Sequence, residues 1–244
     1  FFSYLNFMIS VCIATYNGEK YLREQLDSIL PQLGLDDEVI ISDDSSTDNT
    51  LKIIEEFNDC RIKIFANNKF HSPILNFENA LKKAQGDFIF LSDQDDVWQS
   101  NKVEVVMKYL NNGIDLVLSD GMIVDAHLDV VSTSIYALLN SHKGFVRNLI
   151  HNSYSGSRMA FTRKVLEYVL PFPKKIAMHD IWIGLCAELF FRVEFISDSL
   201  ILYRRHGDNA SVTGGKSPFG FGYKIQYRIY IVIQLIKRWV ILKK

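Results

Sequence analysis

The first 120 residues repeat one pattern: a short run rich in β-branched residues, a polar loop, and a segment with apolar side chains at helical spacing. The runs of strand type are at 9–14, 38–41, 62–65, 87–91 and 114–118. The segments with helical spacing are at 21–30, 51–57, 74–84 and 102–110. Strands that alternate with helices pair in parallel through right-handed crossovers. The repeat therefore predicts an α/β fold with a mostly parallel central sheet and helices on both faces.

The pattern is weaker beyond residue 120. The expected elements there are a hairpin at 122–131, helices at 144–151 and 178–189, and two short strands at 193–196 and 200–203. In the first half, Ser46 or Thr47 is expected to be the N-cap of the helix at 51–57. A chain of 244 residues suits one sizeable domain.

The charges are balanced overall but uneven along the chain. The sequence has 27 Lys and Arg against 28 Asp and Glu, so nucleic acid is not an expected partner. No acidic residue follows Asp208, whereas seven cations do: Lys216, Lys224, Arg228, Lys237, Arg238, Lys243 and Lys244. Three widely spaced cysteines and the lack of a basic leader favour a cytoplasmic location. The apolar segment 229–236 is shorter than the roughly 20 residues that a spanning helix needs.

Polar segments follow three of the expected strands, at 15–17, 43–46 and 93–96. In an open parallel sheet the carboxyl ends of the strands meet at one edge, where ligands bind. Taken singly, each segment is better interpreted as a turn or a helix cap. The three together indicate a binding site.

Asp93 and Asp95 are two residues apart, so in extended backbone their carboxylates point the same way. Two like charges this close need a cation, and hard oxygen ligands suit Mg²⁺ or Mn²⁺, whose coordination is usually completed by water and substrate phosphates. The pair therefore predicts a diphosphate substrate. The chain has no GxxxxGK[ST] loop and no GxGxxG after the first strand, which argues against P-loop phosphoryl transfer and dinucleotide oxidoreductases.

Three motifs in order, ISVCIATYNG, IISDDSSTDNT and FIFLSDQDDVW, resemble those of family 2 glycosyltransferases of the GT-A fold, over roughly residues 8–212. The variant SDQDDVW, with HDIW and YRRHGDNAS downstream, is similar to bacterial rhamnosyltransferases that build cell-wall and surface polysaccharides from dTDP-L-rhamnose. The resemblance implies a Rossmann-like nucleotide-sugar-binding half at 1–120 and a smaller half, for the acceptor and the catalytic base, at 121–212. A basic apolar tail follows at 213–244.

The same resemblance implies a role for each motif residue. It places Ala14, Thr15 and Tyr16 in the nucleobase pocket with Asp44 on the pyrimidine N3–H, Asp93 and Asp96 on the donor, Asp95, Asp96 and His206 near a divalent metal (Mn²⁺ or Mg²⁺), and Asp180 as catalytic base. The segment 67–71 lacks the glycine that many members carry there.

Several of these residues also have structural interpretations. Asp180 can be the N-cap of a helix at 181–189, and His206 can be a solvated surface residue beside two arginines. Trp98 and Trp182 are expected to be packing residues rather than sugar platforms.

The motifs imply an inverting, metal-dependent transfer of a sugar, with rhamnose from dTDP-rhamnose as the first candidate, to a hydroxyl of a glycan or lipid-linked glycan. A sugar nucleotidyltransferase is the first alternative, but TYNGEKYL is not the Gly-rich, Arg- or Lys-bearing loop that such enzymes use. A non-catalytic nucleotide-sugar-binding domain is the second, and it would not need Asp180. A glycosidase would leave the first two motifs unexplained.

The basic apolar tail also has two interpretations. A segment of this composition can lie in the headgroup region of an anionic membrane, which predicts peripheral contact with the inner face of the plasma membrane. Alternatively, it forms a helix that packs on its own domain or on a second subunit.

Overall fold

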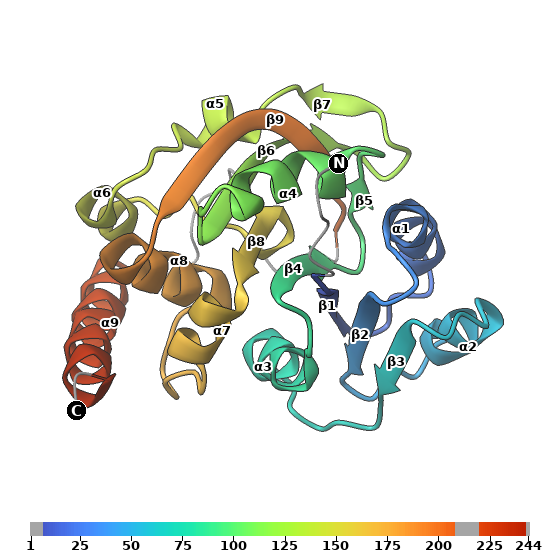
Figure 1. Cartoon of the computed structure of the whole chain (residues 1–244), viewed down its shortest axis with the longest axis horizontal. Helices are drawn as coiled ribbons and strands as arrows, with labels where there is room; N and C mark the ends of the chain where they lie inside the picture. Colours follow the sequence, from blue (N-terminus) through green and yellow to red (C-terminus); the bar gives the residue numbers. More distant parts are fainter. Residues whose placement is uncertain (1–6, 208–219, 243–244) are drawn as a thin grey trace.

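A computed structural model describes residues 7–207 and 220–242, and in these ranges one nine-stranded sheet is covered by helices on both faces (Figure 1). The strand order is β3-β2-β1-β4-β8-β6-β9-β5, and β7 pairs with β6. The strands are β1 Ile9–Thr15, β2 Glu38–Asp43, β3 Ile62–Phe65, β4 Phe88–Asp93, β5 Val97–Trp98, β6 Leu116–Val124, β7 Val130–Ser132, β8 Met159–Thr162 and β9 Val193–Arg204. The predicted α/β class is confirmed.

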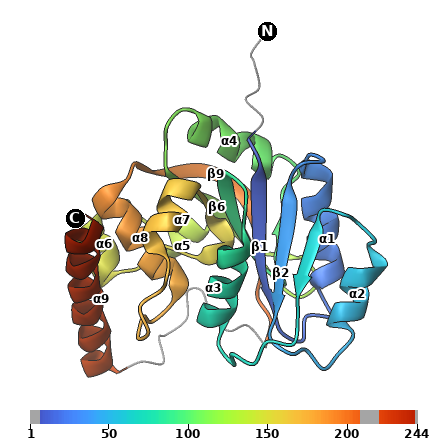
Figure 2. The ribbon, with the colours of Figure 1, turned by 60° about the horizontal axis from the view of Figure 1, so that its bottom comes forward.

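The helices cover the sheet in two sets. They are α1 Leu22–Ile29, α2 Thr50–Glu56, α3 Pro73–Lys83, α4 Lys102–Asn111, α5 Ile135–Leu139, α6 Phe145–Ile150, α7 Arg163–Val169, α8 His179–Phe190 and α9 Phe221–Leu242, with single 3₁₀ turns η1 Leu30–Gln32 and η2 Gly156–Arg158. Alternate residues of each strand face opposite sets: Cys12 packs in one core cluster with α3, α7 and α8, whereas Val11 and Ile13 pack in the other with α1, α2 and α4. Figures 1 and 2 show both layers.

Four of the five strands of the predicted repeat, β3, β2, β1 and β4, are neighbours and pair in parallel. Their register aligns the carboxyl ends, because Ala14 of β1 pairs with Ser42 of β2 on one side and with Asp93 of β4 on the other. The loops that follow these three strands therefore leave the sheet at the same level and the same edge.

The second half of the sheet differs from the sequence prediction. The two short strands expected at 193–196 and 200–203 are one long strand, β9, which pairs in parallel with β6 and curves along the molecule (Figure 1). The polar residues between the two predicted strands lie where the register of the β6–β9 pairing shifts, next to Asp120 of β6. They therefore mark an irregularity in the pairing and not the end of a strand. The strand β8, which was not expected, pairs antiparallel with both β4 and β6.

The N-cap predicted for the helix after β2 is wrong. The cap residue of α2 is Asn49, and the helix begins at Thr50. Ser46 instead donates its hydroxyl to Asp43 (2.5 Å), and the Asp48 carboxylate accepts the Thr50 N–H (3.0 Å). The polar residues 46–48 therefore build the loop, and Asn49 is the residue that precedes the helix.

The tail forms α9, which packs at the edge of the domain beside α6 and α8 (Figure 2). Ile231 and Leu235 are buried in the same core cluster as α8. Arg228 donates to the carbonyls of Leu149 and Ile150, both at 2.7 Å, and Arg238 donates to two carbonyls of the loop after α7. The interpretation of the tail as a helix on its own domain is confirmed. Among the described residues, no helix has the length and apolarity to cross a membrane.

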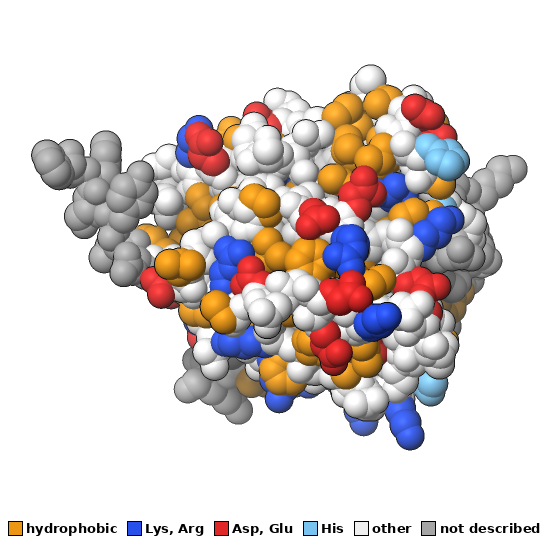
Figure 3. Space-filling model, turned by 90° about the vertical axis from the view of Figure 1, so that its right-hand side faces the viewer, with side chains coloured by type: hydrophobic (Ala, Val, Ile, Leu, Met, Phe, Trp, Pro, Cys, Tyr) orange, Lys and Arg blue, Asp and Glu red, His pale blue; other side chains and the backbone are white. Residues whose placement is uncertain are grey.

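The face that carries α1 and α2 shows acidic and basic side chains interspersed with apolar ones (Figure 3). One pair on it, Arg23 and Glu56, links the two helices across the surface. Both side chains of this pair are about half exposed, so the interaction contributes little to stability.

Candidate active site

The loops after β1 and β2 are joined by a buried hydrogen-bond network centred on Asp43. Its carboxylate accepts the Thr15 hydroxyl (2.9 Å) and both the N–H and the hydroxyl of Ser46 (2.9 and 2.5 Å). The Asp44 N–H donates to the Thr15 carbonyl at 3.0 Å. Thr15 is 1% exposed and Ala14 is partly buried against the core, so both support the loop from beneath.

The Asp44 carboxylate holds the segment after β3. Its two oxygens accept the backbone N–H groups of Phe70 (2.6 Å) and Ser72 (3.2 Å), and the residue is nearly buried. This segment is the one that lacks the family glycine, and it turns instead through Asn67 and His71, which have positive φ angles of 62° and 49°. Asparagine and histidine tolerate this left-handed conformation better than most residues. Asp44 thus fixes a loop at the same rim.

The acidic loop after β4 is only partly open to solvent. Asp93 and Asp95 are half-buried, and Asp96 is fully buried with its Oδ1 accepting the Arg204 N–H at 3.0 Å. Asp96 Oδ2 is buried and has no hydrogen-bond partner. Burial, with the charges of Asp95 and Asp180, raises the pKa of Asp93 to about 7, and burial together with Asp95 and Asp93 raises that of Asp96 well above its ordinary value. These carboxyl groups therefore resist ionisation in the ligand-free protein, and a cation bound at the loop would favour their ionised forms.

His206 contacts the acidic loop. Its Nε2 lies 2.8 Å from Asp95 Oδ2, and its ring packs 4.7 Å from that of Tyr21. Its side chain is 10% exposed, so the interpretation of His206 as a solvated surface residue is wrong. The rest of its motif, residues 208–211, lies outside the described residues.

Arg204, just before this histidine, fastens β9 to the acidic loop. Its Nε donates to the Asp95 carbonyl (2.9 Å), its Nη1 donates to the Ala126 carbonyl (2.9 Å), and it forms an ion pair with Glu24 of α1. The guanidinium also lies over the Tyr21 ring at 4.5 Å. Arg204 is therefore a clamp that joins three parts of the chain at the acidic loop.

Asp180 lies in the first turn of α8 and is not its N-cap. The cap is Met178, the helix begins at His179, and Asp180 Oδ1 accepts the adjacent Ile181 N–H at 2.6 Å. Burial raises the pKa of Asp180 to about 6, although that hydrogen bond and the Arg158 charge lower it. Because Asp180 also raises the pKa of Asp93, the structure brings the two carboxylates into one electrostatic neighbourhood.

Two buried basic residues beneath the acidic residues are not apparent from the sequence. Lys102 is 1% exposed, its Nζ donates to the Ser157 carbonyl (2.7 Å), and burial lowers its pKa to about 7 against the opposing effect of Asp96 and Asp93. Arg158 is also 1% exposed and donates to the carbonyls of Ser119 (3.2 Å) and Ser153 (2.7 Å). A lysine at the start of a helix looks solvated in sequence, and Arg158 precedes a strand that the pattern did not predict.

Trp98, Trp182 and His179 are packing residues. The Trp98 indole donates to the Ser92 hydroxyl and the Trp182 indole to the Val169 carbonyl, both at 3.0 Å, and both rings are buried. The expectation that the tryptophans pack is confirmed. The His179 ring stacks on Phe77 at 4.2 Å, and burial lowers its pKa to about 3, so it stays neutral.

The side chains at the acidic loop are of the types that bind divalent metals, but they are not arranged as a site made of protein ligands alone. Among the described residues, no three His, Cys, Asp or Glu side chains lie close enough together to hold an ion. Mg²⁺ is usually held by one or two carboxylates together with water and substrate phosphates. Asp95 and the adjacent His206, with the unpartnered oxygen of Asp96 beneath them, fit such a shared site.

Known proteins resemble this chain in sequence and in fold. The model of glycosyl transferase family 2 matches residues 10–170. The dTDP-rhamnosyl transferase RfbG of Shigella flexneri is 44% identical over 99 residues, which are 38% of this chain and 34% of the relative. The UDP-Glc:alpha-D-GlcNAc-diphosphoundecaprenol beta-1,3-glucosyltransferase WfgD of Escherichia coli is 32% identical over 121 residues, 49% of this chain and 48% of the relative. The match thus spans a third to a half of these relatives.

The fold is shared with S. aureus TarS. Its crystal structure with residues 1–349 in complex with UDP aligns with a TM-score of 0.65 at 25% identity, covering 81% of this chain and 60% of the TarS chain.

Proposed function

This chain belongs to glycosyl transferase family 2, and we propose that it transfers a sugar from a nucleoside diphosphate donor to a hydroxyl of a glycan or lipid-linked glycan in bacterial polysaccharide synthesis. The observation that carries the proposal is the shared rim, where the loops after β1, β2 and β4 meet Asp95, His206 and, in electrostatic range, Asp180. The similarity to RfbG supports rhamnose from dTDP-rhamnose as the donor.

In this proposal the donor lies across the rim. Tyr16, which is 56% exposed, and the backbone at Ala14 and Thr15 border the nucleobase, and the Asp44 carboxylate accepts the pyrimidine N3–H beside the two backbone N–H groups that it already holds. Asp93 lies toward the ribose and diphosphate. The position of these groups on successive parallel strands supports a ligand that spans them.

A divalent metal, Mn²⁺ or Mg²⁺, would be held by Asp95 and His206 and completed by the donor phosphates. Bound there, it supplies Lewis-acid stabilisation of the charge on the departing nucleoside diphosphate. Direct ligation by Asp96 requires its buried Oδ2 to become accessible, and until then Asp96 holds the Arg204 backbone.

Asp180 is the proposed base of an inverting transfer, in which it takes the proton of the acceptor hydroxyl. A pKa near 6 leaves the carboxylate ionised at neutral pH and makes it more basic than an ordinary aspartate. A positioned base typically contributes roughly 10²- to 10⁴-fold in rate. The second half of the domain, 121–212, would then supply the acceptor surface and this base, while 1–120 binds the donor.

Donor binding separates this function from its alternatives. A thermal-shift panel of UDP, dTDP, GDP and CMP, each with Mn²⁺ or Mg²⁺, should stabilise the fold with a preference for dTDP or UDP. Asp180→Asn should keep this binding and lose transfer. Full activity in that variant would contradict the assignment of Asp180 as the base. If the wild-type protein instead made a nucleotide sugar from a sugar 1-phosphate and a nucleoside triphosphate, the nucleotidyltransferase would be favoured. Binding without any turnover in the wild type would favour the non-catalytic domain.

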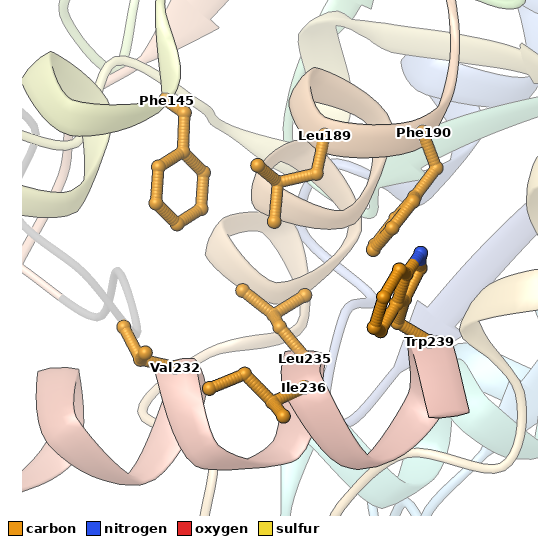
Figure 4. Close-up of a pocket in the computed structure, with 7 residues that line it drawn as sticks. All are labelled: Phe145, Leu189, Phe190, Val232, Leu235, Ile236 and Trp239. Carbon is orange, nitrogen blue, oxygen red and sulfur yellow. The ribbon is translucent and has the colours of Figure 1, made fainter. Parts of the chain in front are cut away.

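The tail helix supports peripheral contact with an anionic membrane. On the side away from its buried residues, α9 exposes a stripe of aliphatic side chains: Ile225, Ile229, Ile233, Ile236 and Val240, each between 41% and 57% exposed. Beside the stripe, α9, α6 and α8 enclose an apolar hollow of about 320 Å³ lined by Phe145, Leu189, Phe190, Val232, Leu235, Ile236 and Trp239 (Figure 4). Lys224 and Lys237 also lie on this helix, and no acidic residue does. We infer that the stripe enters the headgroup region at the inner face of the plasma membrane.

Flotation with vesicles that contain anionic lipid tests this contact. Ile229→Ser combined with Ile233→Ser should release the protein from the vesicles. The matched control is Val130→Ser with Val131→Ser, which removes two equally exposed apolar side chains from β7. Equal flotation of all three proteins would remove the membrane proposal without affecting the proposed activity.

A further inference from the structure

Gln94 connects the loop after β1 to the acidic loop. It lies between Asp93 and Asp95, and its side-chain amide forms two hydrogen bonds with the backbone of Tyr16: the Tyr16 N–H donates to Gln94 Oε1 at 2.9 Å, and Gln94 Nε2 donates to the Tyr16 carbonyl at 3.0 Å. The two bonds use one donor and one acceptor on each side, so they define both the position and the orientation of the amide. The contact spans 78 residues of sequence.

Gly18 provides the space in which this amide lies. A Cβ at position 18 would be 2.6 Å from Gln94 Oε1 and 2.9 Å from its Cδ, far inside van der Waals contact. The conflict is with the end of a flexible side chain, so an alanine at 18 would displace Gln94 and leave the fold intact. The Gly18 N–H donates to the Thr50 hydroxyl at 2.7 Å, and an alanine keeps that bond.

Next to Tyr16, the loop after β1 is also hydrogen-bonded to the loop after β2. The Asn17 N–H donates to the Ser46 hydroxyl (2.8 Å), and Asn17 Oδ1 accepts the Thr47 N–H (2.8 Å). The Gln94 contact is thus the direct hydrogen-bonded link, among the described residues, between the backbone at Tyr16 and the Asp93–Asp96 loop.

We propose that Gln94 is a positioning residue that sets the distance between nucleobase recognition and diphosphate binding. This inference rests on the proposed function, because a nucleoside diphosphate joins a base and a diphosphate through one ribose and must fit both loops at once. Holding the two loops at the bound spacing before the ligand arrives reduces the ordering cost of binding. A ligand that reaches only one of the loops gains nothing from this preorganisation.

The test is a double-mutant cycle with Gln94→Ala, Gly18→Ala and the double variant, measured by titration calorimetry with dTDP and UDP, each with Mn²⁺. Each single variant should bind the nucleotide roughly tenfold more weakly than wild type, the size expected for losing two neutral hydrogen bonds. Gly18→Ala should have almost no further effect in the Gln94→Ala protein, because the side chain that it displaces is already gone. Inorganic pyrophosphate with Mn²⁺, which lacks a base, should bind all four proteins within about twofold.

Gln226→Ala and Gly222→Ala are the matched controls. Gln226 is an exposed glutamine of α9, and a Cβ at Gly222 meets nothing within 4 Å. Both should bind nucleotide like wild type. Additive losses in the cycle, an equal loss for pyrophosphate, or wild-type binding by Gln94→Ala would overturn the positioning role alone. A wild-type protein that binds neither nucleotide would instead contradict the proposed function, and the inference with it.

Discussion

Asp93→Asn should stabilise the ligand-free protein at neutral pH. The side chain keeps its shape but loses a charge that is half-buried and close to Asp95 and Asp180. Because the folded-state pKa is raised to about 7, the folded chain binds this proton more tightly than the unfolded chain does. The wild type therefore loses stability as the pH rises from about 4, where the unfolded carboxyl ionises, through about 7.

The magnitude follows from the same two values. An ordinary pKa of 3.8 against about 7 in the folded state corresponds to a penalty of at most ~4 kcal/mol at pH 7. Partial exposure to water screens the charge, so we expect a gain of ~1–3 kcal/mol from the substitution. For a domain of this size that is a rise in Tm of roughly 2–12 °C.

The assay is urea unfolding of wild type and Asp93→Asn at pH 7 and pH 4, without metal. The advantage of the variant should fall below about 1 kcal/mol at pH 4, where both forms are close to neutral at this position. Asp36→Asn, at an exposed carboxylate, is the control and should change little. A variant that is less stable than wild type at pH 7, or equally favoured at both pH values, would refute the reasoning.

Three further predictions concern the same rim. With saturating metal and donor, kcat/KM should fall as the pH drops below about 6, because Asp180 takes up a proton; a kcat/KM that does not change between pH 5 and pH 8 would argue against Asp180 as the base. Asp44→Ala frees the N–H groups of Phe70 and Ser72, so calorimetry should find nucleotide binding at least roughly tenfold weaker; an unchanged Kd would place the nucleobase elsewhere. Burial lowers the pKa of Lys102 to about 7, so the folded chain binds this proton less tightly than the unfolded chain does; Lys102→Met should therefore gain stability relative to wild type in urea as the pH falls from about 10 through about 7, and a difference that does not change with pH would show that burial does not penalise this charge.

The parallel half of the fold could be predicted from the sequence because each of its strands and loops has a local sequence pattern. Each of β1, β2 and β4 is a short buried run that ends in a polar loop, and a parallel sheet requires those ends to meet at one edge. The second half was harder because β9 continues through Asp198, an exposed polar residue that looks like a strand end. Its continuity depends on pairing with β6, which is distant in sequence.

The same distinction applies to the site. The sequence identified the residues on the rim, but not which of them are used to hold loops: Asp43 builds the first network, while Asp44 fixes the segment at 70–72. The burial of Lys102 and Arg158 could not be predicted from the sequence, because it results from tertiary packing and gives no signal in the local composition. The Gln94 contact escaped notice because it joins two loops 78 residues apart.

The most direct measurement is anomalous scattering from Mn²⁺ in crystals grown with dTDP or UDP, whichever nucleotide binds more tightly in solution. We predict one strong peak bonded to a carboxylate oxygen of Asp95 and to the diphosphate, with the base beside Tyr16 and Asp44. A nucleotide held on another face of the molecule, or a metal bound away from Asp95 and the phosphates, would contradict the account of this rim as the sugar-transfer site.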